Sequence, residues 1–185
     1  MEVNDNIEES AGKCSLCGNA LTAFGSKPLA DGVLCRDCAK IVSEWLSDED
    51  LRGMKLAKVK RHFAYRAKNA EKLQSFTPTQ SLDAKYDLHI DENAKTFVIS
   101  KKKDFVKDNA DVLKLSSIKD VQILEEACEG ENAGVDVMLE MHLRGWYIKH
   151  VKFRVNEFPG LEKDSEDYIK TKETAEAYLR MLGRM

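Results

Sequence analysis

The stretch CSLCGNALTAFGSKPLADGVLCRDC, residues 14–38, contains two Cys-x-x-Cys pairs and decides how the start of the chain folds. Seventeen residues separate Cys17 from Cys35. This spacing is typical of a tetrahedral site in which four thiolates hold one zinc ion at about 2.3 Å. Each pair forms a tight turn that directs both sulfurs to the ion, and the intervening loop brings the two turns together. We therefore predict that Cys14, Cys17, Cys35 and Cys38 bind one zinc ion.

The predicted site is closed. Because all four ligands are cysteines, no position is left for water or substrate, and such sites stabilise a fold without taking part in catalysis. Metal binding worth about 10–16 kcal/mol, as is typical for such sites, dominates the stability of so small a module. Two alternatives stay open: iron in place of zinc, and a redox role for the dithiols. The redox role lacks the βαβ context in which thioredoxin-like proteins carry their pair.

A basic helix is predicted over residues 48–76. Ser47 and Asp50 form the Ser-x-x-Asp pattern of a helix start, and Pro78 limits the other end. The segment carries a charge of +4, between −3 for residues 1–47 and −4 for residues 77–185. The favoured interpretation is a solvated helix face whose apolar stripe packs on a neighbouring core. The alternative is a phosphate-binding surface for nucleic acid or an anionic membrane.

From residue 80 onward the hydrophobic period changes to two, which predicts strands. Residues 86–90 and 96–100 form one predicted hairpin, and residues 118–126 a further strand. The strongest alternation runs over residues 135–143 and returns over 147–155. Residues 165–185 have the pattern of a closing helix that buries Ile169, Ala175, Tyr178, Leu179 and Leu182.

These patterns predict an α+β fold of four segments. They are an acidic disordered tail, a zinc ribbon, a linking helix, and an antiparallel β-domain closed by a C-terminal helix, over residues 1–12, 13–47, 48–76 and 80–185. The chain of 185 residues has a net charge of −3, which argues against a general nucleic-acid binder. The tail holds four acids and no base, unlike a secretory signal, and no apolar stretch is long enough to span a bilayer. We expect a cytoplasmic protein.

Two weaker features lie in the β-domain. Cys128 stands alone among glutamates, so we interpret it as an incidental thiol and not as a nucleophile. His142 and His150 lie on consecutive predicted strands and face each other across the hairpin. Such a pair suits a second metal site or a pH-sensitive contact, although exposed strand histidines are also common without either role. No catalytic motif is recognised, so no catalytic residue is predicted.

The segment CSLCGNALTAFGSKPLADGVLCRDCAK resembles the short N-terminal zinc ribbon of many bacterial proteins of unknown function. In those proteins a helix and a β-rich domain similar to the pleckstrin-homology-like fold often follow. Residues 80–184 resemble that domain in strand order, with VLKLSSIKDVQILEE leading into a strand and VKFRV preceding the last helix. The resemblance implies a metal role for Cys14, Cys17, Cys35 and Cys38.

The function expected from the sequence is that of a non-enzymatic, zinc-binding adaptor with a protein or peptide partner. Nucleic-acid binding through the ribbon and the basic helix is the first alternative, and a dithiol redox protein is the second.

Overall fold

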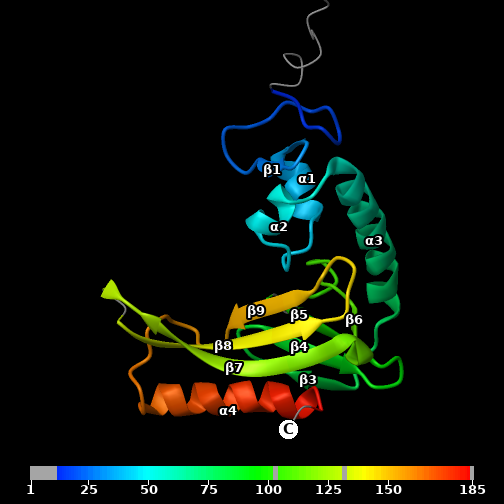
Figure 1. Cartoon of the computed structure of the whole chain (residues 1–185). Coiled ribbons are helices and arrows are strands. Elements are labelled where there is room, and N and C mark those ends of the chain that lie inside the picture. The colour runs from blue at the N-terminus through cyan, green and yellow to red at the C-terminus, as the bar shows by residue number, and fades with distance from the viewer. Residues whose placement is uncertain (1–11, 102–103, 131–132, 184–185) are drawn as a thin grey trace, which may run out of the picture. The chain divides into compact units, whose positions relative to one another are not determined.

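The structure is a computed structural model that describes residues 12–101, 104–130 and 133–183. Apart from Gly12, the predicted tail lies outside these residues. The chain divides into two compact units, Met1–Lys68 and Asn69–Met185. Figure 1 labels the elements of both units and colours them in chain order.

The first unit combines a small hairpin with short helices. Strands β1 and β2 pair antiparallel and are followed by three helices, of which the last continues into the second unit. The elements are β1 (Lys27–Leu29), β2 (Gly32–Leu34), α1 (Arg36–Ile41), α2 (Asp48–Arg52) and α3 (Leu56–Ser75).

The single helix predicted over residues 48–76 is wrong, because the structure has two helices there. The predicted start is correct: Ser47 and Asp50 form a reciprocal capping box. Gly53 ends α2, and Met54 turns into the core with only 4% of its surface exposed. The Asp31 carboxylate then accepts a hydrogen bond of 2.6 Å from the Leu56 amide at the start of α3. Burying Met54 thus interrupts the helical path that the local pattern favours.

Helix α3 buries a stripe that is partly polar. The predicted apolar stripe includes Val59 and Leu73, which are both buried, but His62, Arg66 and Asn69 between them are buried too. Their spacing of three and four residues places all five on one face. Sequence analysis missed the polar members because polar residues are mostly exposed.

Each buried polar side chain of α3 has a partner within its own unit. The His62 Nε2 atom accepts a hydrogen bond of 3.1 Å from the Ser43 amide, and Arg66 Nε donates to the Ile41 carbonyl at 3.0 Å. In the second unit, Asn69 donates to the Ala110 carbonyl at 2.7 Å and accepts from the Val112 amide at 2.8 Å. These bonds offset the cost of burial.

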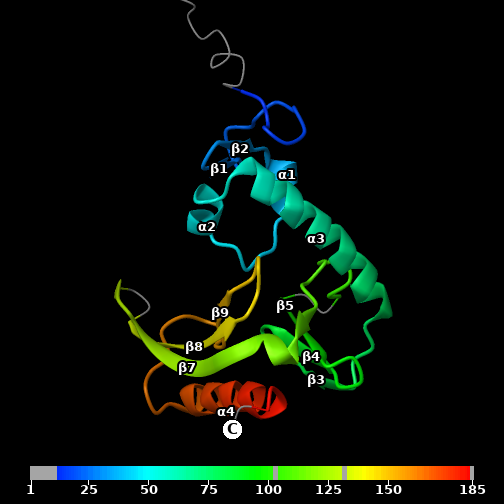
Figure 2. The ribbon, with the colours of Figure 1, turned by 45° about the vertical axis from the view of Figure 1, so that its right-hand side comes forward.

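The second unit contains two antiparallel sheets and a helix, which confirms the predicted α+β class. Among the described residues the sheets are separate and no barrel closes. In Figures 1 and 2, α4 runs along the sheet that contains β7 and β8, and it contacts both strands. The first sheet comprises β3 (Gln80–Leu82), β4 (Asp87–Asp91), β5 (Thr96–Ser100) and β6 (Leu113–Lys114). After the short 3-10 turn η1 (Leu115–Ser117), the second comprises β7 (Ile118–Cys128), β8 (Gly134–Leu143) and β9 (His150–Arg154), and α4 spans Glu166–Met181.

The core of this unit follows the predicted alternation. Val137, Leu139 and Met141 of β8 are fully buried, as expected from the period of two. Tyr178 of α4 is fully buried too, and its hydroxyl donates a hydrogen bond to the Tyr86 carbonyl. The prediction for Ile169 is wrong, because half of its surface is exposed. Only one side of α4 packs on the sheet. Ile169 lies at the border of that side, so its side chain is partly in solvent.

Strand β4 departs from a simple in-and-out pattern, because all five of its residues are buried. On the face expected to be polar, the His89 ring packs on Phe105 at a centroid distance of 4.8 Å. Its Nδ1 atom lies 2.8 Å from the Ser81 hydroxyl. Burial lowers the pKa of His89, which favours the neutral ring.

No helix in the part of the chain that the structure describes has the length and hydropathy needed to cross a membrane.

Candidate metal centre

Two local turns position the cysteine pairs. Around the first pair, the Gly18 amide donates to the Cys14 carbonyl at 2.9 Å, and the Cys14 amide donates to the Asn19 carbonyl at 2.7 Å. Gly18 has a φ of 77°, a left-handed conformation that favours glycine. In the second pair, Cys35 is the residue before α1 and Cys38 lies in the first turn of that helix. Both turns therefore form from local backbone bonds.

Ser15 holds the first turn against strand β2. The Ser15 amide donates to the Val33 carbonyl at 2.9 Å, and its hydroxyl oxygen accepts from the Val33 amide, also at 2.9 Å. Val33 lies two residues before Cys35, so these two bonds bring the cysteine pairs together. Sequence analysis missed this role of Ser15, since a serine between two cysteines carries no signal of its own.

Gly32 makes the approach of Ser15 possible. A Cβ atom at this position would lie 2.4 Å from the Ser15 hydroxyl oxygen. The sequence predicts a turn at Asp31-Gly32, and the structure adds a second reason for glycine, namely the close contact with Ser15.

The four predicted ligands form one cluster. Their sulfur atoms all lie within 4.8 Å of one another, and the Cys17 and Cys35 sulfurs are 3.7 Å apart. A zinc ion with four bonds of about 2.3 Å has a tetrahedron edge of about 3.8 Å. A disulfide needs a separation of about 2.05 Å, and all four thiols are free. The arrangement fits a tetrahedral four-thiolate metal ion.

Burial and backbone bonds shift the thiol pKa values in different directions. Burial raises the pKa of Cys14, but hydrogen bonds from the amides of Cys17, Cys35 and Leu16 outweigh it and lower this pKa to about 6. For Cys38, burial and the neighbouring thiols raise the pKa. The Asn19 amide lowers the pKa of Cys17, but burial and the Cys14 thiol outweigh it, so the net shift is upward. Neighbouring thiolates repel one another, which raises the free energy of the deprotonated cluster. A divalent cation bound among them would offset this repulsion.

The cluster is part of the core of the first unit. Cys14, Cys35 and Cys38 are buried, whereas Cys17 is exposed. They pack with residues from the hairpin, α2, α3 and the segments that connect the helices, namely Leu29, Leu34, Val42, Leu46, Leu51, Met54 and Val59. A metal ion held here ties the hairpin and α1 to the same small core.

The site leaves no ligand position open, because four sulfurs complete a tetrahedron. Its chemistry is that of a structural centre. Cys128 does not belong to the cluster; burial and the nearby Asp136 raise its pKa, as suits an unreactive thiol.

Residues 13–62 match a family model described as "Domain of unknown function (DUF4428)". The match starts at Lys13 and ends at His62, so it contains all four cysteines. It also contains Val59, which packs in the same core, and His62, which accepts the hydrogen bond from Ser43. Comparisons with curated proteins and with solved structures gave no match. The bacterial origin and the pleckstrin-like architecture suggested by resemblance therefore stay predictions.

We expect the substitution Gly32→Ala to loosen the metal centre. The added Cβ displaces Ser15, breaks its bonds to Val33 and destabilises the first unit by about 1–3 kcal/mol. The measurement is the rate at which a chelator removes bound metal, which should rise about fivefold or more.

Gly53→Ala is the matched control in the same unit, because its nearest neighbours lie at 3.6 and 3.7 Å and leave room for a methyl group. Equal metal loss from the two variants would contradict the role given to Gly32.

Proposed function

We propose that this chain is a non-enzymatic interaction protein in which a structural zinc centre organises the first unit and the second unit binds a protein or peptide. The observation that carries the proposal is the closed cluster of four thiols. A centre without an open ligand position stabilises a fold, and interaction modules too small for a sufficient core commonly depend on such a metal.

Zinc is the proposed metal. Four tetrahedral thiolates suit either zinc or iron, but a Cys-x-x-Cys pair repeated across a short ribbon is the usual framework of structural zinc. A redox use of the dithiols fits less well, because the structure gathers all four sulfurs at one point and three of them are buried.

We expect the full chain to carry one tightly bound zinc ion, measured by native mass spectrometry and elemental analysis. Each of the substitutions Cys14→Ser, Cys17→Ser, Cys35→Ser and Cys38→Ser should abolish tight binding and unfold the first unit, because metal binding supplies its folding free energy. Cys128→Ser is the control and should keep the metal.

Three results would count against this assignment. A metal-free chain with an intact first unit removes the structural role. Bound iron replaces the assignment of zinc. Thiols that turn over in a disulfide-reduction assay favour the redox alternative.

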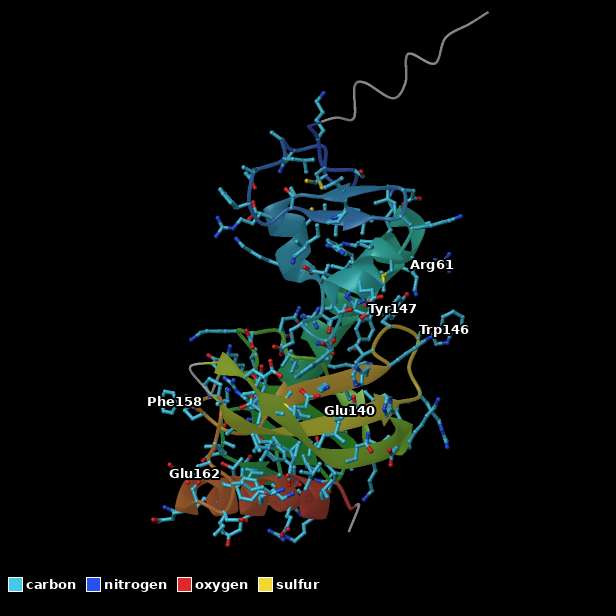
Figure 3. All side chains as sticks on the ribbon, turned by 60° about the vertical axis from the view of Figure 1, so that its left-hand side comes forward. Arg61, Glu140, Trp146, Tyr147, Phe158 and Glu162 are labelled. Atoms are coloured by element: carbon cyan, nitrogen blue, oxygen red, sulfur yellow. The ribbon has the colours of Figure 1, made fainter. Side chains whose placement is uncertain are left out.

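A cavity in the second unit supports peptide binding. It has a volume of about 380 Å³ and lies between the β3–β4 loop, the segment after β9 and helix α4. Phe158 at its edge is 76% exposed, and Figure 3 shows this ring projecting from the segment that precedes α4. Lys85 donates to the carbonyls of Asn156 and Glu157 at 2.9 and 3.3 Å, which braces the wall. An exposed aromatic ring beside polar groups is typical of a site that anchors an apolar side chain of a peptide.

We expect Phe158→Ala to lose the protein partner that the wild-type chain captures from its source cells. The measurement is affinity capture followed by quantitative mass spectrometry of that partner. Phe24→Ala is the matched control, since Phe24 is also strongly exposed but belongs to the first unit. Equal capture by wild type and Phe158→Ala would exclude this cavity as the binding surface, and no captured partner would contradict the interaction role.

A second candidate function is binding of nucleic acid by helix α3. Lys58, Arg61 and Lys68 are exposed, and at 100° per residue they fall within about 80° of the helix circumference. Tyr65 lies on the same strip, with its ring stacked on His62 at 5.6 Å. Cations interleaved with an aromatic ring are suited to phosphates and bases. The whole chain has a net charge of −3, whereas residues 48–76 carry +4. Any binding of nucleic acid is therefore expected at this strip and not over the whole surface.

If this second function exists, the triple variant Lys58→Gln, Arg61→Gln and Lys68→Gln should abolish binding of a short DNA at about 50 mM salt, measured by fluorescence anisotropy. The affinity of the wild-type chain should fall with rising salt. The logarithm of the association constant should decrease with the logarithm of the salt concentration, with a slope of about −0.9 for each phosphate contacted. A triple variant of the exposed Lys114, Lys119 and Lys149 to Gln makes the same change in charge and should still bind. No wild-type binding at this salt concentration would rule the candidate out.

A further inference from the structure

Two histidines face each other on the second sheet of the second unit. His142 of β8 is the cross-strand partner of His150 of β9. The adjacent Leu143 amide donates to the Lys149 carbonyl at 2.8 Å, so the histidines form a pair without a backbone hydrogen bond between them. Opposite side chains come closest in such pairs. The two rings stack with a centroid distance of 5.1 Å and an angle of 18°.

Glu140 completes the cluster. It lies two residues before His142 and therefore on the same face of β8. Its Oε1 atom is 2.8 Å from Nε2 of His150, and its Oε2 atom is 3.7 Å from Nε2 of His142. The histidine side chains are 48% and 46% exposed, but that of Glu140 is only 15% exposed. The carboxylate thus forms the floor of a small site whose imidazoles reach solvent, and Figure 3 labels Glu140 on this sheet.

Neighbouring strands hold the carboxylate in place. Gln122 of β7 pairs with Glu140 in register, and its amide donates to Oε2 at 2.7 Å. This hydrogen bond, against the opposing effect of burial, lowers the pKa of Glu140 and keeps it ionised at neutral pH. Lys152, the partner of Glu140 on β9, directs its ammonium group to Glu126. The carboxylate therefore keeps its charge and has no direct ion pair with that lysine.

We propose that Glu140, His142 and His150 form a second metal site, which binds a divalent transition-metal ion such as Zn²⁺ independently of the cysteines. Imidazole nitrogens and a carboxylate oxygen are the donors that such ions prefer. One donor atom from each residue lies within 4.8 Å of the others. Donors bound at about 2.0–2.1 Å are at most about 4.2 Å apart, so a small rotation of the exposed imidazoles is enough.

The proposed site differs from the cysteine centre in two ways. Three protein ligands leave a fourth tetrahedral position for water or for a donor from a binding partner. The donors lie on the paired strands β8 and β9, which form without a metal ion, so the fold does not depend on the ion. The ion is therefore exchangeable, and its affinity is lower than that of the four-thiolate centre.

The test uses the full chain with its cysteine centre already loaded with zinc. Equilibrium dialysis against increasing free Zn²⁺, followed by elemental analysis, should show a second and weaker equivalent. His142→Gln and His150→Gln should each weaken this equivalent at least tenfold, because each removes one of three ligands. Lys152→Gln is the control on the same face, and it should keep the second equivalent because it removes a cation and no ligand.

The first equivalent of zinc reports on the cysteine centre of the first unit. An unchanged thermal unfolding transition of the second unit, followed by circular dichroism, shows that its fold is intact in each variant. Saturation at one equivalent would overturn the proposal and leave the three side chains as a hydrogen-bonded surface cluster. A second equivalent that survives both histidine substitutions would also overturn it. Because the two equivalents are measured separately, failure of one site is distinguishable from failure of the other.

Discussion

The convergence of four thiols is the constraint on which the first unit depends. Its strands have three residues each and its first two helices six and five, so none of these elements is stable alone. The contact between Ser15, Val33 and Gly32 brings the two cysteine turns to one point, and apolar residues from every element close around it. A metal ion bound at this point would supply the cohesion that so small a core lacks.

Helix α3 shows how a polar stripe can be buried at low cost. Val59 and Leu73 bury apolar surface toward its two ends, whereas His62, Arg66 and Asn69 between them hydrogen-bond backbone groups at the end of α1 and in loops. Each of these bonds lies within one unit, with His62 and Arg66 serving the first and Asn69 the second. Apart from Arg66, the basic residues of the helix are exposed on other faces, where their charges are solvated.

The two candidate metal sites use different chemistry because they lie in different settings. Four soft thiols in a small unit are placed for a closed tetrahedron, and under the proposed function loss of the ion would unfold this unit. Imidazoles and a carboxylate on a sheet with its own apolar core form an open site, which the fold can do without. The chain therefore has two donor clusters, of which the first suits a structural ion and the second an exchangeable one.

The sequence is enough to predict the clustering of the four cysteines, the longer strands of the second unit and the closing helix, because Cys-x-x-Cys turns and hydrophobic periodicity are local properties. It also predicted that His142 faces His150. The three-dimensional packing is needed to show that α2 and α3 separate at Met54, that three polar residues of α3 are buried, and that Ser15 needs Gly32. It likewise decided that Glu140, oriented by Gln122, completes the histidine pair. These features depend on contacts between segments far apart in the chain, which no local pattern encodes.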